Sequence, residues 1–173
     1  MTENRALEMD LEADDNPDVL ACRKAWDELR GSHTMPAWSD FDWFAFPTGV
    51  LPYFVVADVI DGGADFVYRF WGSAHTEIFH RDYTQNLVSS VRPAQIAEEM
   101  LRQYRRVLET GAPCLFMFEL MGGRGRNIPI RESSLRLPFA AADGSIGYIV
   151  SLSDNRRQSK DFSEFFTAFG GIG

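Results

Sequence analysis

The stretch 65–82 constrains the fold most, because in it a strand pattern passes into a helix pattern almost without a loop. Side chains from Phe66 to Trp71 alternate with the period of two that is typical of a strand. One face of this strand is predicted to carry Phe66, Tyr68 and Phe70. Gly72 ends the strand, and Ser73 follows as the start of a short helix. A junction this tight is typical of a pocket or of the edge of a core.

Hairpin signals place this strand in a five-stranded antiparallel sheet. The predicted strands are residues 53–60, 65–72, 113–121, 128–140 and 145–153. The first two flank the turn at Asp61–Ala64, and Asp143-Gly144 joins the last two.

Helices are predicted before, within and after this set of strands. Residues 17–30 and 93–110 each begin at a proline, stop before a glycine and carry apolar side chains at helical spacing. The C-terminal stretch 161–169 holds four Phe on one helical stripe. They are Phe162, Phe165, Phe166 and Phe169. The order of helix, two strands, helices and three strands predicts an α+β domain with helices on one sheet face, plus flanking N- and C-terminal helices.

Composition indicates one globular domain that follows an acidic tail. The chain has 173 residues, of which 45% are hydrophobic, and 14 Phe, too many aromatic side chains for a disordered protein. The net charge of −8 is concentrated in residues 1–20, which carry seven acidic residues and one Arg. We expect residues 1–16 to be mobile. The rest of the chain is close to neutral, which argues against a nucleic-acid partner, and the small basic cluster of Arg124 and Arg126 is expected at a solvated hairpin tip.

Localisation is predicted from the apolar runs, the N-terminal end and the cysteines. No apolar run approaches the roughly 20 residues that a membrane span needs, and the N-terminal end has no basic region typical of a secretory signal. Cys22 and Cys114 are expected to be buried thiols in a reducing compartment. These features predict a cytoplasmic protein that does not contact a membrane.

The sequence gives no positive sign of catalysis or of a metal site. His75 and His80 are five residues apart, which places them about 140° apart around a helix and not on one face. Asp40 and Asp42 have the spacing of a carboxylate pair but lack a basic or metal-ligating neighbour, so we expect solvated or capping roles. No nucleophile elbow, phosphate-binding loop or paired-cysteine motif occurs. We therefore predict that the protein is not an enzyme.

Several short motifs, taken in order, resemble one known family. The run around the strand-to-helix junction reads Phe66 to Phe70, Gly72-Ser73-Ala74 and Phe79-His80-Arg81-Asp82-Tyr83-Thr84. This sequence resembles that of the bacterial PAS-like domains of the PAS_5 group, and the resemblance extends over about residues 19–155. The chain departs from it at His80 and Gln85, where such domains often carry Gly, so the turn there is expected to differ. The predicted order of strands and helices is also the PAS order.

The resemblance implies a sensory or regulatory module made of residues 17–155, with residues 156–173 as a C-terminal amphipathic helix. Such a module binds a small ligand or a protein partner and signals by surface contact. Two alternatives stay open: a small-molecule-binding enzyme or carrier on a related α+β cup, and a pure protein-interaction or dimerisation domain. A cluster of polar side chains pointing into one cavity would favour the enzyme or carrier.

Candidate ligand-binding residues follow from testing the cofactors of PAS sensors against the sequence. A flavin adduct needs a Cys after the second strand, and none lies between Trp71 and Gly111. Haem is disfavoured because residues 93–110 contain no His. The cofactor is therefore left unassigned. An aromatic-lined space between sheet and helices remains, and its predicted lining is Tyr68, Phe70, His75, Tyr104, Phe116 and Phe118. The alternative is that these side chains only fill the core.

A homodimer is the last expectation. The helices 17–30 and 161–169 are amphipathic and flank the core, so their apolar stripes must be covered by the sheet or by a second copy of the chain. The resemblance to PAS-like domains, which often pair through such flanking helices, adds to this expectation.

Overall fold

The computed structural model describes residues 5–121 and 129–170 of the chain. The predicted hairpin tip with Arg124 and Arg126 lies outside the described residues. The strands are β1 (Arg5–Met9), β2 (Phe54–Ile60), β3 (Asp65–Trp71), β4 (Cys114–Met121), β5 (Pro129–Ala140) and β6 (Ile146–Asp154). The helices are α1 (Pro17–Arg30), α2 (Ser73–Phe79), α3 (Ala94–Thr110) and α4 (Ser159–Gly170). Short 3-10 turns connect several of these elements, and none of the described helices is long and apolar enough to cross a membrane.

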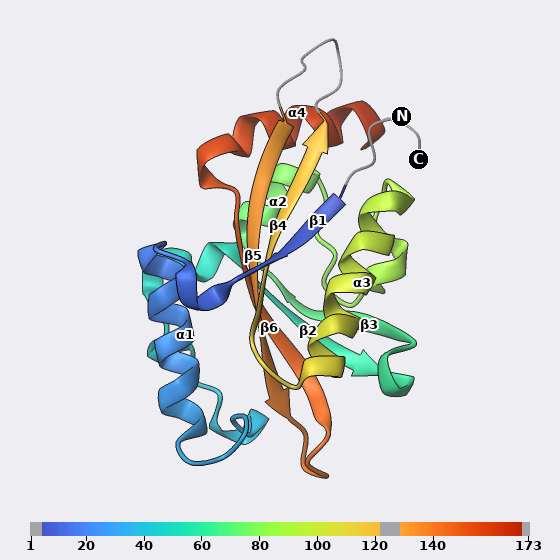
Figure 1. Cartoon of the computed structure of the whole chain (residues 1–173). Helices are drawn as coiled ribbons and strands as arrows, with labels where there is room; N and C mark the ends of the chain where they lie inside the picture. Colours follow the sequence, from blue (N-terminus) through green and yellow to red (C-terminus); the bar gives the residue numbers. More distant parts are fainter. Residues whose placement is uncertain (1–4, 122–128, 171–173) are drawn as a thin grey trace.

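The strands form one antiparallel sheet in the order β1-β4-β5-β6-β2-β3 (Figure 1). The α+β class and the five predicted strands are confirmed. Pro17 is the first residue of α1, and Gly111 caps α3 with a φ of 63° and a bond from its N–H to the Val107 carbonyl. Gly is common at such a position because the left-handed conformation costs it little.

The sixth strand, β1, was not predicted. It lies in the segment expected to be a mobile tail and pairs with β4 from Arg5↔Glu119 to Met9↔Leu115. Ala6 faces the core, the carboxylate of Glu8 lies 2.9 Å from Arg106, and Arg102 donates to the Ala6 carbonyl at 2.9 Å. The strand is short and its neighbours in the sequence are acidic, so local composition did not predict it. Pairing with β4 and side-chain contacts with α3 stabilise it.

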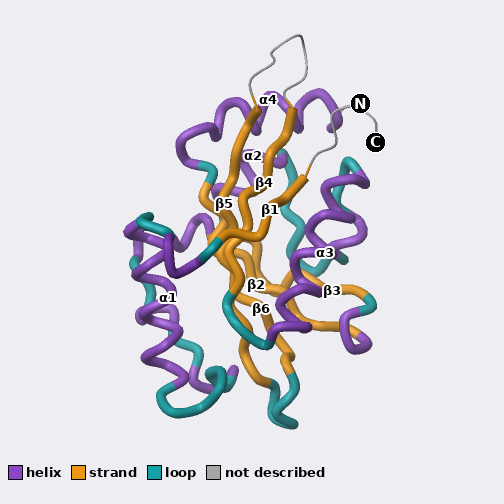
Figure 2. Tube along the Cα trace, viewed as in Figure 1, coloured by secondary structure: helices purple, strands orange, loops and turns teal. Residues whose placement is uncertain are grey.

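Helices lie on both faces of the sheet (Figure 2): the central helices share one face, as predicted, and the N-terminal flanking helix lies on the other. α2, α3 and α4 pack on one face, while α1 and the aromatic segment 35–53 pack on the other. The indole N–H of Trp26 in α1 donates to the Pro138 carbonyl of β5 at 2.8 Å. Trp38 stacks on Tyr148 of β6 with ring centroids 4.4 Å apart. The aromatic segment therefore wraps the core, as its irregular sequence indicates.

Phe70 lies on the face opposite to Tyr68, which corrects the predicted alternation of β3. The register against β2 shifts between Val56 and Ala57, so that Val56 pairs with Phe70 and Ala57 with Tyr68. Arg69 is the extra residue of this bulge, and a bulge moves every later side chain to the other face. Phe70 thus packs beside Trp43, with ring centroids 4.8 Å apart, on the α1 side.

His80 and Gln85 adopt the left-handed backbone conformation, with φ of 57° and 64°. These are the two positions where the chain departs from the glycines of the resembling family. The backbone conformation there is the one that Gly adopts at least cost, so the side chains differ while the turn keeps a glycine-type geometry.

The tight junction after β3 depends on the missing side chain of Gly72. Its N–H donates to the Phe54 carbonyl at 2.9 Å, and a Cβ on Gly72 would lie 2.1 Å from the Pro52 carbonyl oxygen. Backbone atoms cannot yield as a flexible side chain can. The turn before β2 and the start of α2 are therefore held together by direct backbone contact.

We predict that Gly72→Ala lowers the free energy of unfolding by about 2 kcal/mol or more, because the new methyl group forces the two backbones apart. The control is Gly49→Ala, where the added Cβ meets nothing within 4 Å. Urea unfolding of both variants measures the difference. Equal stabilities of the two variants would contradict the close contact.

Candidate functional site

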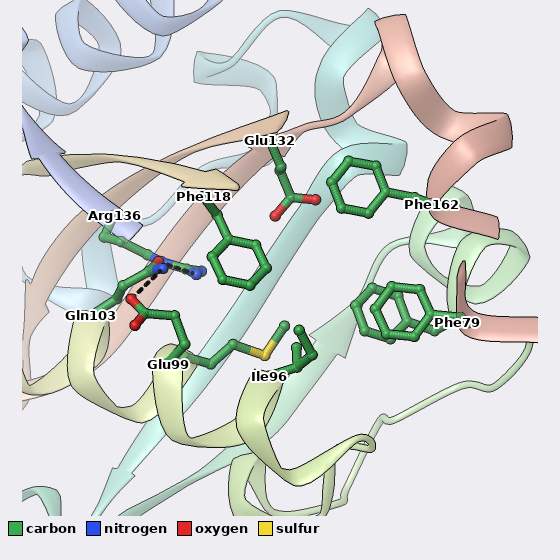
Figure 3. A pocket seen from close by; sticks show the side chains of 10 residues that line it. Phe79, Ile96, Glu99, Gln103, Phe118, Glu132, Arg136 and Phe162 are labelled. Atoms are coloured by element: carbon green, nitrogen blue, oxygen red, sulfur yellow. Dashed lines mark hydrogen bonds between the residues drawn. The ribbon is translucent and has the colours of Figure 1, made fainter. Parts of the chain in front are cut away.

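Two adjoining pockets lie between the sheet and the helices α2, α3 and α4. We call the first the α4 pocket; its space is about 330 Å³ including its open mouth, and its lining is Phe79, Ile96, Glu99, Met100, Gln103, Phe118, Glu132, Arg136, Phe162 and Phe166 (Figure 3). The second, the α2 pocket, has about 250 Å³ measured in the same way and is lined by Val55, Tyr68, Trp71, His75, Phe79, Met100, Tyr104, Glu132, Arg136 and Ser153. Phe79, Met100, Glu132 and Arg136 line both, so the pockets meet at these side chains. The enclosed part of each has room for only about one water molecule.

The structure brings together four of the six predicted ligand-binding residues. Tyr68, His75 and Tyr104 line the α2 pocket, and Phe118 lines the α4 pocket. Phe116 is fully buried in the same core but lines neither pocket, and Phe70 lies on the other face. That the four residues bind a ligand stays a prediction.

Arg136 of β5 is the charged group at the meeting point of the pockets, and sequence reasoning missed it. Only 3% of its surface is exposed. Its Nη2 donates to Oε1 of Gln103 at 2.9 Å and its Nη1 to the Tyr104 hydroxyl at 3.3 Å, and the guanidinium lies 4.5 Å from the Tyr104 ring centroid. These partners in α3 are neutral, so the guanidinium charge is buried without a carboxylate partner among the described residues.

Glu132 faces the same space from four residues earlier in β5. Figure 3 shows its carboxylate pointing between Phe118 and Phe162. It accepts hydrogen bonds from the Asn155 amide at 3.0 Å and from the Ser134 hydroxyl at 3.3 Å. Burial raises the pKa of this carboxyl above its ordinary value, against the opposing effect of these hydrogen bonds and of Arg136. The site therefore holds a cation and an acid with separate, neutral partners.

A pattern in β5 could have revealed these two residues. Glu132, Ser134 and Arg136 alternate with the buried Leu135 and Leu137. In a central strand covered on both faces, polar side chains at every second position point into the protein. The signal requires the knowledge that both faces of β5 are covered, which depends on the packing of α1 and the aromatic segment 35–53.

Glu99 lines the α4 pocket and forms an ion pair with Arg102. Its carboxylate lies 2.7 Å from Arg102 and accepts a hydrogen bond from Nε2 of Gln103 at 3.3 Å. Gln103 thus donates to Glu99 and accepts from Arg136, as the dashed lines in Figure 3 show. The amide fixes the direction of the Arg136 side chain.

Trp71 and His75 place two unpartnered polar atoms in the wall of the α2 pocket. The Nε2 of His75 lies 2.9 Å from the Tyr53 carbonyl and therefore carries the proton. Its Nδ1 is then an acceptor, and neither this atom nor the indole N–H of Trp71 has a partner within the described part of the chain. Both side chains are at least 95% buried. One free donor and one free acceptor thus belong to side chains that line the pocket.

The two thiols lie away from these pockets. Burial and the nearby Asp18 raise the pKa of Cys22 to about 12, and burial also raises the pKa of Cys114. Such thiols are poor nucleophiles. No group of three or more His, Cys, Asp or Glu side chains within residues 5–121 and 129–170 could hold a metal ion. Asp42 caps a 3-10 turn by accepting from the Phe44 N–H at 2.9 Å, the structural role expected of it.

His75 makes the stability of the fold depend on pH. Desolvation lowers its pKa from 6.5 to about 4, so below pH 6.5 the unfolded chain binds a proton that the folded chain does not bind until about pH 4. We predict that the wild type loses about 2 kcal/mol more unfolding free energy between about pH 7 and about pH 5 than His75→Gln does. Urea titrations at both pH values measure this. Equal losses in the two proteins would contradict a buried neutral imidazole.

Comparisons with known proteins leave the family open. No protein-family model matches the chain, and no curated protein matches it. Among solved structures the chain is similar to one described as "Structure of an RNA-binding Light-Oxygen-Voltage Receptor", with a TM-score of 0.45 and 10% sequence identity. The match covers 76% of this chain and 39% of that chain, so this chain spans about two fifths of that structure's length.

Proposed function

We propose that the protein is a PAS-like sensory module that binds a small ligand between its sheet and the helices α2, α3 and α4. The observation that carries this proposal is the pair of opposite charges, Arg136 and Glu132, facing pockets that three helices enclose. Burying a charge without an ion partner costs several kcal/mol, and such a cost is commonly retained at sites that bind something. The order of strands and helices, which resembles that of PAS-like domains, supports the same proposal.

Helix α4 is the element through which binding reaches the surface. Phe162 and Phe166 of α4 form one wall of the α4 pocket, and Phe166 stacks on Phe79 with ring centroids 4.0 Å apart. Nε2 of His80, at the end of α2, lies 2.9 Å from the Thr167 hydroxyl and 3.1 Å from the Ser163 carbonyl. A ligand that enters the pocket must displace these aromatic rings. The signal then leaves by a changed surface on α4.

A small-molecule carrier is the second candidate function. A cluster of polar side chains in one cavity favours an enzyme or carrier, and Arg136, Glu132 and Gln103 form such a cluster. Carriage needs no reactive group, so it fits these side chains better than catalysis does. A carrier would release its ligand unchanged with no change in α4, whereas a sensor would change the exposure of α4.

We predict that freshly purified protein retains a small molecule, seen as added mass on the chain by native mass spectrometry and in the supernatant after denaturation. Arg136→Gln should lose it, because the guanidinium is the buried charge of the pocket. Arg69→Gln is the control, since Arg69 pairs with Asp58 at an exposed site outside the pockets.

Thermal melting first establishes that both variants fold. The absorption spectrum of the same sample reports a coloured cofactor. No mass beyond that of the chain in either wild type or Arg136→Gln, with nothing released on denaturation, would count against ligand sensing.

A homodimer is the second part of the proposal, with an interface changed from the one the sequence suggested. Phe162, Phe165 and Phe166 are buried within their own domain, so α4 does not need a second copy to cover them. The edge strand β1 instead exposes Leu7 and Met9, at 44% and 43%. An edge strand with exposed apolar side chains is a template for pairing with another chain. We therefore propose that two copies pair through β1.

Light scattering at tens of micromolar tests this pairing. The wild type should have twice the 19.6 kDa mass of the chain, and the double variant Leu7→Lys, Met9→Lys should have the monomer mass. Leu87→Lys is the control, because Leu87 is equally exposed at 42% near the opposite edge of the sheet. A monomeric wild type would end the dimer proposal without affecting ligand binding.

A further inference from the structure

We infer that the ligand is a small zwitterion, an α-amino acid with a short apolar side chain, with its carboxylate on Arg136 and its ammonium on Glu132. The inference rests on the proposed ligand-binding function and names the class of ligand. It starts from two charges of opposite sign that face the same space and are not paired with each other.

The two charges share a strand face but stand apart. Arg136 and Glu132 are four residues apart in β5, which separates their Cα atoms by roughly 13 Å at the rise of an antiparallel strand. Both side chains nevertheless line both pockets, and Figure 3 shows the Glu132 carboxylate pointing between Phe118 and Phe162. They form no ion pair with each other, because Arg136 bonds to Gln103 and Tyr104 and Glu132 to Ser134 and Asn155. A molecule placed between them meets a cation on one side and an acid on the other.

The charge of the ligand follows from this arrangement. A simple carboxylate would pair with Arg136 and bring a second negative charge beside Glu132. An amine would pair with Glu132 and bring a positive charge beside Arg136. A molecule that carries both groups satisfies both side chains and adds no net charge to a buried site, where uncompensated charge is most costly.

The unpartnered atoms of the α2 pocket extend the match. The indole N–H of Trp71 is a donor suited to a carboxylate oxygen, and Nδ1 of His75 is an acceptor suited to an ammonium N–H. A carboxylate accepts up to about four hydrogen bonds and an ammonium donates three, so one amino acid can serve these atoms and the two charged side chains together.

The apolar lining limits the size of the side chain. Phe79, Phe118, Phe162 and Met100 line the α4 pocket, whose enclosed part holds only about one water molecule. Met100 is the unbranched side chain of this wall and shares a 3.3 Å contact between its sulfur and the Tyr68 hydroxyl. Because a thioether side chain adapts readily to a new neighbour, its movement can open space for a few carbon atoms. The small enclosed space therefore favours a short aliphatic chain over a large aromatic one.

Isothermal titration calorimetry on the full chain tests the assignment with matched probes. L-alanine is compared with propionate, which lacks the ammonium, and with ethylamine, which lacks the carboxylate; L-valine and L-leucine extend the apolar chain. We expect an amino acid of this series to bind at least about tenfold more tightly than either truncated probe, because each truncation removes one ion-paired group.

Variants assign the two groups to their side chains. Arg136→Gln should weaken amino-acid binding at least about tenfold. Glu132→Gln should do the same and also shift the preference toward propionate, because the acid that repels a second carboxylate is gone. Arg69→Gln, at the exposed pair with Asp58, should bind like the wild type.

The outcomes separate this inference from the proposed function. Propionate or ethylamine binding as tightly as the amino acids would overturn the zwitterion, while the dependence on Arg136 would preserve the pocket as a binding site. No binding of any amino acid of the series also overturns it. A different molecule that wild type retains and Arg136→Gln loses would then still support the sensory function. If wild type retains no molecule, both the sensory function and the amino-acid assignment are wrong.

Discussion

The buried guanidinium of Arg136 is the group on which the arrangement of this domain depends. β5 lies inside the sheet and sends Leu135 and Leu137 into one core and Ser134 and Arg136 into the other. Apolar side chains alone could fill the second core with many packings, but a buried guanidinium needs hydrogen-bond acceptors in fixed places. Gln103 and Tyr104 of α3 provide them, so the charge on the sheet sets where α3 lies over it.

That position of α3 leaves a space that α4 must close. α3 supplies Ile96, Met100 and Gln103 to the α4 pocket, and Phe162 and Phe166 complete the opposite wall. α4 packs mainly against α2, so its attachment depends on aromatic packing such as the Phe79–Phe166 stack. Packing of this kind is sensitive to small changes in volume. Under the proposed function, this packing is what would couple a bound ligand to the surface of α4.

Local sequence signals predicted most helices and strands. Contacts between residues far apart in the chain determine the features that were not predicted. Pro17, Pro93 and Gly111 mark helix ends because caps and breakers act within a few residues, and the five longer strands follow from alternation and turns. β1 was not predicted, because its five residues lie beside an acidic run and form a strand only by pairing with β4. The face of Phe70 depends on a bulge that is defined by its partner strand. Tyr68, His75 and Tyr104 were predicted as lining of a space between sheet and helices. Arg136 and Glu132 were missed because they bond to residues far away in the chain, Gln103 and Asn155.

The two edges of the sheet differ, and the difference bears on where a partner can attach. At β3 the backbone of Tyr68 exchanges bonds with segment 85–86: its N–H donates to the Asn86 carbonyl at 3.0 Å and its carbonyl accepts from Gln85 at 2.7 Å. The left-handed residues His80 and Gln85 turn the chain back to make this contact, at a cost of about 1 kcal/mol each relative to Gly. The contact with residues 85–86 covers the outer side of β3, so this edge is closed to a further strand. Among the described residues no backbone segment covers β1 in this way, although the Arg102 side chain donates to the Ala6 carbonyl, so β1 is the edge left for strand pairing.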